Sequence, residues 1–167
     1  FYPNPTRCNT HFTNDIRRVM QSIIAKVIER EGGDKLTKDP SDPGGTTKYG
    51  ISQRANPDVD IENLTLQQAV SIYKEKYWDP SRAVDFPKQL MDMYFDMCVN
   101  FGQFKAVKIV QEAVNHKGLS KLKVDGRIGP KTIKAVQALE KERLRAFRVM
   151  HYAKICMANK KLMKYYY

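Results

Sequence analysis

The feature that most constrains this chain is an apolar series that ends on a carboxylate. From Thr13 or Asn14, either a fair helix N-cap, apolar residues recur at three- and four-residue steps over residues 16–28. This spacing predicts a helix with one buried face. Glu31 is the next member of the series, and Gly32-Gly33 follows it at once. Because glycine adopts the left-handed conformation at little cost, we expect the helix to end there with Glu31 directed inward.

A carboxylate on a buried helix face is suited to general acid catalysis. Burial disfavours the ionised form and raises the pKa of such a group, so it still holds a proton near neutral pH. Glycoside hydrolysis needs an acid of this kind to protonate the leaving oxygen. The alternative is a glutamate at a frayed helix end that bonds to solvent or a loop amide, and position alone favours this structural interpretation.

The segment that follows the glycines is rich in Pro, Gly, Asp and Thr. Its alternating pattern around Tyr49 predicts a short strand within a small sheet near residues 37–52. Asp42 and Thr47 are joined by a Pro-Gly-Gly turn, so such a sheet can place a carboxylate and a hydroxyl across a cleft from Glu31. A plain hairpin turn is the alternative.

The rest of the chain has helical patterns. Thr65 and Gln68 match a capping box, which predicts a helix that starts at Thr65 and ends at Asp79-Pro80. Aromatic residues on and after this helix (Tyr73, Tyr77 and Trp78) are expected in the core, with Trp78 kept open as a cleft residue. We therefore predict a mainly α fold with one small β element. The further predicted helices start at Pro87, near residue 104 and, as a long or broken basic helix, at Pro130.

The net charge of +11 is distributed unevenly. Residues 1–102 carry 13 Lys and Arg against 14 Asp and Glu, whereas residues 103–167 carry 16 against 4. The basic part should attract a polyanion such as nucleic acid, anionic lipid or an anionic cell wall, unless it is only a solvated helical surface. We find no motif of a known nucleic-acid-binding module and expect no nucleic-acid partner.

Two further features bear on location and cofactors. No apolar run approaches the roughly 20 residues that span a bilayer, and the N-terminal residues do not match a signal peptide. The three cysteines (Cys8, Cys98 and Cys156) are far apart, which argues against a disulfide framework or a zinc site. Synthesis in a reducing cytoplasm is the natural interpretation.

The run EREGGDKLTKDPSDPGGTTKYGIS (residues 29–52) resembles the signature of glycoside hydrolase family 108, the N-acetylmuramidases that include phage endolysins. The pattern is Glu-Gly-Gly, then Asp-Pro-Gly-Gly, one variable residue, Thr, Lys, Tyr, Gly and Ile. Further matches at residues 64–80 and 95–102 extend the resemblance to about residues 15–150. The family usually has a His at the position of Phe101. It often has an aromatic residue at the position of Asp34, where we expect altered local packing or substrate contact but no loss of the chemistry.

This resemblance implies a lysozyme-like helical fold that hydrolyses the β-1,4 bond between N-acetylmuramic acid and N-acetylglucosamine. Glu31 carries over as the catalytic acid, and Asp42, Thr47, Tyr49 and Asn100 as residues that bind substrate or position water. It implies no cofactor and no metal, and it leaves inversion or retention open. A lytic transglycosylase, which closes an anhydro ring in place of adding water, and a non-catalytic cell-wall-binding protein are the alternatives.

Residues 107–139 are similar to peptidoglycan-binding helical modules, whose pattern ends in Val-Asp-Gly, two residues, Gly-Pro, one residue and Thr. A well-capped helix connection explains the same residues without a ligand. We expect an extension (1–12), a lysozyme-like catalytic part (13–102) and a basic helical part (103–167) packed into the same globule. The expected protein is a monomer whose partner is bacterial peptidoglycan, made in the cytoplasm and acting on the cell wall or periplasm by phage-type release or from a virion.

Overall fold

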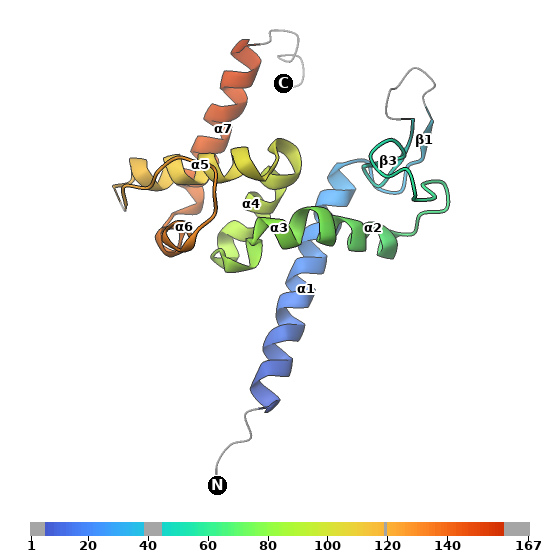
Figure 1. Ribbon diagram of the computed structural model, residues 1–167, viewed down its shortest axis with the longest axis horizontal. Helices are drawn as coiled ribbons and strands as arrows, with labels where there is room; N and C mark the ends of the chain where they lie inside the picture. Colours follow the sequence, from blue (N-terminus) through green and yellow to red (C-terminus); the bar gives the residue numbers. More distant parts are fainter. Residues whose placement is uncertain (1–5, 39–44, 119, 159–167) are drawn as a thin grey trace. The chain divides into compact units, whose positions relative to one another are not determined.

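The computed structural model of the chain describes residues 6–38, 45–118 and 120–158 (Figure 1). The chain divides into two compact units, Phe1–Asp79 and Pro80–Tyr167. Helices dominate both units, which confirms the predicted mainly α fold with one small sheet. None of the helices in the described ranges combines the length and apolarity needed to cross a bilayer.

The first unit is built on the long helix α1 (Thr6–Arg30). It starts earlier than predicted, because residues 6–13 contain no glycine or proline to interrupt it. The predicted apolar face is confirmed: Ile24 and Val27 are fully buried, and Ile28 is 2% exposed. Each such side chain stabilises the fold by about 1.5–3 kcal/mol. This face packs against helix α2 (Leu66–Tyr73).

A three-stranded antiparallel sheet lies near the C-terminal end of α1 (Figure 1). Its strands are β1 (Thr37–Lys38), β2 (Thr46–Lys48) and β3 (Ile51–Ser52), in that order. The position of the sheet confirms the predicted β element, but the single strand expected through Tyr49 is a hairpin. Tyr49 (φ 55°) and Gly50 (φ 71°) form its turn, and two successive positive φ values match the twist that tight hairpins need.

The start of α2 is as predicted, and its end is not. Thr65 and Gln68 form the expected capping box, in which the Thr65 amide donates to Gln68 Oε1 at 2.9 Å. The predicted stop at Asp79-Pro80 is wrong, because the helix continues through a π turn, η1 (Lys74–Trp78), into α3 (Asp79–Ser81). The π turn shifts the backbone ladder, and an ion pair of 2.7 Å between Lys74 and Asp79 spans it.

The second unit contains α4 (Lys88–Phe101), α5 (Gln103–His116), α6 (Pro130–Val136) and α7 (Lys141–Ala158), preceded by the short turn η2 (Ala83–Asp85). Helices α4, α5 and α7 pack on one another. The predicted third and fourth helices are confirmed to within about one residue, and the basic helix after Pro130 is broken into α6 and α7. Tyr94 is fully buried and stacks on Phe86 with ring centroids 3.8 Å apart.

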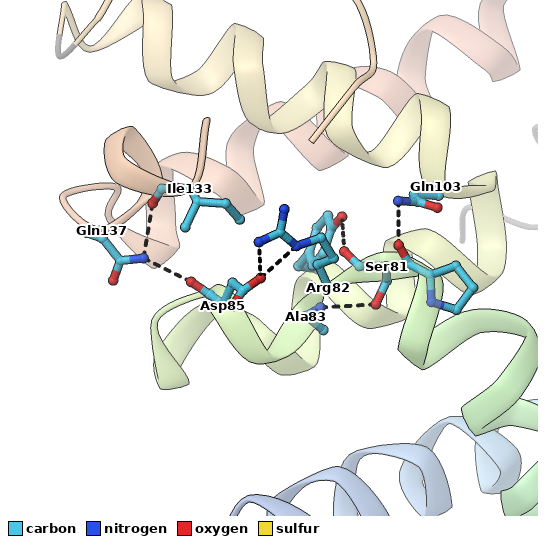
Figure 2. Close-up of polar contacts among 9 residues, drawn as sticks. Ser81, Arg82, Ala83, Asp85, Gln103, Ile133 and Gln137 are labelled. Carbon is cyan, nitrogen blue, oxygen red and sulfur yellow. Dashed lines mark hydrogen bonds and ion pairs between the residues drawn. The ribbon is translucent and has the colours of Figure 1, made fainter. Parts of the chain in front are cut away.

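Hydrogen bonds join the start of this unit to helices that follow much later (Figure 2). Gln137 Nε2 donates to the Asp85 carbonyl at 2.9 Å, and Gln103 Nε2 donates to the Pro80 carbonyl at 2.7 Å. These bonds help to place residues 80–102 in one compact unit with the later helices. The division at residues 102 and 103 rests on sequence similarity and stays a prediction.

Candidate active site

Glu31 occupies the end of α1 in a well-defined helix cap. The Gly33 amide donates to the Ile28 carbonyl at 3.0 Å, and the Gly32 amide donates to the Glu29 carbonyl at 3.3 Å. This pair of bonds is the Schellman arrangement, in which the last helical carbonyls are satisfied by the residues that leave the helix. Both glycines have positive φ values, of 113° and 58°. The predicted helix end at Gly-Gly is therefore confirmed.

The expectation that Glu31 is directed inward is wrong, because the residue is exposed. The last helical residue is Arg30, so Glu31 lies at the cap, beyond the buried face that finishes at Ile28. Its stem nevertheless has a close neighbour: a Cβ placed on Gly50 would lie 2.7 Å from Glu31 Cβ. The aliphatic part of Glu31 thus lies against the β2–β3 turn while the residue remains accessible to solvent.

That turn is held from two sides. The Tyr49 amide donates to the Gly33 carbonyl at 2.9 Å, which joins the turn to the loop after Glu31. The Tyr73 hydroxyl donates to the Tyr49 carbonyl at 3.1 Å, which joins it to α2. A left-handed conformation costs a residue with a side chain about 1–2 kcal/mol. Tyr49 adopts it because these tertiary bonds outweigh that strain.

Gly50 is required by space as well as by its φ of 71°. A Cβ at this position would lie 2.6 Å from the Tyr73 hydroxyl oxygen and 2.7 Å from Glu31 Cβ. Side-chain carbons do not normally approach other heavy atoms so closely. The turn can therefore contact both Glu31 and Tyr73 only because residue 50 has no side chain.

Tyr73 supports the turn as a neutral donor. It is 2% exposed, and burial raises the pKa of its hydroxyl, with the negative charge of Glu31 raising it further. The group therefore stays protonated and can donate to Tyr49. The sequence predicted Tyr73 as a core residue, which is confirmed, but it missed this role of the hydroxyl. The available signal was a tyrosine, whose buried hydroxyl needs a partner, where a phenylalanine would have sufficed.

The other candidate residues have different positions. Thr47 is half-buried in the central strand β2, paired with Thr37 and Ser52. Asp42 lies outside the described residues. Asn100 is exposed in the second unit, where its Nδ2 donates to the Asp96 carbonyl at 2.8 Å. The structure thus brings Tyr49 together with Glu31, and it adds Gly50 and Tyr73 to them. Across the described ranges, no three His, Cys, Asp or Glu residues form a group that could hold a metal ion.

Comparison with known protein families identifies the part of the chain that contains this site. Residues 24–102, which contain the helix cap, the hairpin and Tyr73, match the sequence profile of glycosyl hydrolase 108. This part of the chain belongs to the glycosyl hydrolase 108 family. Residues 105–162 of this hydrolase match the profile of a predicted peptidoglycan domain.

A solved structure supports the assignment of the glycosyl hydrolase. SagA from Brucella abortus is 27% identical over 78% of this chain and 75% of that chain, with a TM-score of 0.60. Among curated proteins, no relative matches the chain significantly. The fold is mainly α and lysozyme-like, and the chain is a glycosyl hydrolase that acts on peptidoglycan.

Phe101 is the position at which the family usually has a His. Its ring meets His151 and Tyr152 of α7 edge to face, with centroids 4.8 Å and 4.7 Å apart. Such aromatic pairs contribute about 0.5–1.5 kcal/mol beyond their buried area. In this chain, Phe101 therefore joins the end of α4 to α7.

Proposed function

We propose that this glycosyl hydrolase is an N-acetylmuramidase with Glu31 as its catalytic acid. The observation that carries the proposal is the fixed position of Glu31, between a Schellman cap and the Tyr49-Gly50 turn. General acid catalysis requires a proton donor held at a constant place relative to the scissile bond. The exposure of Glu31 suits a polymeric substrate, which must enter an open site.

In the proposed reaction, Glu31 gives its proton to the glycosidic oxygen of N-acetylglucosamine as the bond from C1 of N-acetylmuramic acid breaks. Water then supplies a hydroxyl to C1, and its remaining proton restores the acid. The products are a new reducing end on N-acetylmuramic acid and a free 4-hydroxyl on N-acetylglucosamine. Tyr49 and Thr47, which share the hairpin beside Glu31, would contact the sugar or the water. Asp42 and Asn100 remain predictions from the resemblance.

Product analysis tests this proposal. Purified peptidoglycan is digested with the hydrolase, and the new chain ends are reduced with borohydride and identified by mass spectrometry. We expect muramitol. Glucosaminitol would identify a glucosaminidase, and an anhydro sugar would identify a lytic transglycosylase. Failure to generate any new chain end would support a non-catalytic cell-wall-binding protein.

We further propose that the hydrolase lyses bacteria as an endolysin, acting on the cell wall or periplasm, and that its basic residues draw it to the anionic wall. Residues 103–167 contain 16 Lys and Arg but 4 Asp and Glu, and this positive balance supports the proposed attraction to the wall. Attraction between exposed charges is screened over about 10 Å at 0.1 M salt. Binding to intact walls should therefore weaken as salt rises, and binding that is independent of salt would contradict an electrostatic role.

A further inference from the structure

A groove in the second unit has the features of a built binding site. Its volume is about 580 Å³, and it lies between Gln111 of α5, the loop of residues 121–129 and the first residues of α6. All of its lining residues belong to the second unit, whereas Glu31 belongs to the first.

The floor of this groove is fixed by one buried amide. Gln111 is 2% exposed, and its Nε2 donates to Asp125 Oδ1 and to the Arg127 carbonyl, each at 3.1 Å. Its Oε1 accepts from the Gly126 amide at 3.0 Å. Hydrogen bonds of this kind hold the loop in one conformation, so a ligand would meet a site that is already ordered.

Close packing fixes the same loop from another direction. Gly126 has a φ of 71°, and a Cβ there would lie 2.5 Å from the ring of Phe104. The loop backbone therefore rests directly on α5 at a position where no side chain fits. The Gly126 amide and the Phe104 ring together leave the loop little freedom to collapse into the groove.

Four exposed cations line the groove. None of them forms an ion pair with another residue that the structure describes. The single acid in the lining, Asp125, accepts from the Arg127 amide and from Gln111, and these bonds, together with the charge of Lys123, lower its pKa. By contrast, Arg143, Arg145 and Arg148 are all paired with acids. The four cations of the groove are Lys121, Lys123, Arg127 and Lys131.

We propose that this groove binds the peptide stems of peptidoglycan through their carboxylates. Leu122 and Ile128 are half-buried in the lining beside the cations, so the site offers apolar contact as well as positive charge. A stem of small D- and L-residues with free carboxylates matches both. In a strand that carries stems, the lactyl carboxyl of N-acetylmuramic acid is taken up in the amide bond to the stem, so the free carboxylates belong to the peptide. The inference rests on the proposed function for its choice of polymer, but it concerns a site other than Glu31.

The test is direct binding to the full-length protein, with no cleavage step. The probes are a synthetic stem, alanyl-γ-glutamyl-lysyl-alanyl-alanine, with free carboxylates and the same peptide with its carboxylates amidated. Titration is followed by calorimetry and by NMR shifts of the Gly126 and Gly129 amides. We expect the free acid to bind and the amide to bind about tenfold more weakly, as two charge-assisted contacts are lost.

A groove variant and a matched control variant test whether the stem peptide binds in the groove. Arg127→Gln with Lys131→Gln removes two cations from the groove, whereas Lys134→Gln with Lys141→Gln removes two exposed cations outside it. The groove variant should lose about tenfold in affinity and the control less than twofold. Equal losses in the two variants, equal binding of the two peptides, or no binding at millimolar peptide would overturn the proposal. Because the stem contains no glycosidic bond, these results stand whatever products the hydrolase makes from glycan.

Discussion

Replacement of Gly50 by alanine tests whether the β2–β3 turn positions Glu31. The new Cβ would lie 2.6 Å from the Tyr73 hydroxyl oxygen and 2.7 Å from Glu31 Cβ. Carbon and its neighbours settle at about 3.5–4.0 Å, so the turn and Glu31 must separate by roughly 1 Å. The left-handed backbone at φ 71° adds about 1–2 kcal/mol of strain to an overpacking cost of about 1–3 kcal/mol.

We therefore expect Gly50→Ala to lower the free energy of unfolding by about 2–5 kcal/mol, measured by urea denaturation. Displacing a catalytic group by 1 Å can reduce turnover by about 100-fold, so kcat for peptidoglycan solubilisation should fall by that order at temperatures where the variant is folded.

Gly118→Ala is the matched control for this variant. Gly118 has a nearly equal φ of 75°, and no described atom lies within 4 Å of an added Cβ. The control should therefore show the backbone strain of about 1–2 kcal/mol without a change in kcat. A Gly50→Ala protein that keeps its turnover, or a Gly118→Ala protein that loses turnover to the same extent, would show that the turn does not position Glu31.

Three further variants examine individual hydrogen bonds and ion pairs of the structure. Tyr73→Phe removes the hydroxyl that donates to the Tyr49 carbonyl, so we expect a loss of about 0.5–1.5 kcal/mol in stability and a several-fold lower kcat; an unchanged kcat would mean that the turn does not need this bond. Arg148→Met removes one charged partner of Asp96, whose side chain is 4% exposed, and should cost about 3 kcal/mol by thermal unfolding. Arg145→Met breaks an exposed pair with Glu142 in the same helix and should cost less than about 1 kcal/mol, so similar losses for the two would contradict the role of burial.

Much of the fold followed from local signals in the sequence. The buried face of α1, the capping box at Thr65 and the Gly-Gly helix end each depend on residues a few positions apart, and each is confirmed. The direction of Glu31 was not predictable in the same way. A helical period gives the direction of a side chain only while the helix continues, and Glu31 is at the cap after Arg30.

The parts of the site that were missed depend on distant contacts. Tyr49 alternates with its neighbours as a strand residue does, and only the bonds to Gly33 and Tyr73 hold it in the left-handed conformation of a turn. Tyr73 and a phenylalanine give the same hydrophobic pattern, so periodicity cannot reveal the hydroxyl bond, which spans 24 residues. The pair between Arg148 and Asp96 spans 52 residues, beyond any local pattern.

The most direct test of Glu31 as the catalytic acid is the rate at which Glu31→Gln releases new reducing ends from purified peptidoglycan. Glutamine keeps the stem that lies against Gly50 and removes only the transferable proton, so the fold and wall binding should be retained. Because general acid catalysis contributes about 10²–10⁴-fold, the rate should fall by at least about 100-fold. The neighbouring change Glu29→Gln, at another exposed position of the same helix end, should leave the rate unaltered. A Glu31→Gln protein that releases muramic acid ends at close to the wild-type rate would show that Glu31 is not the acid.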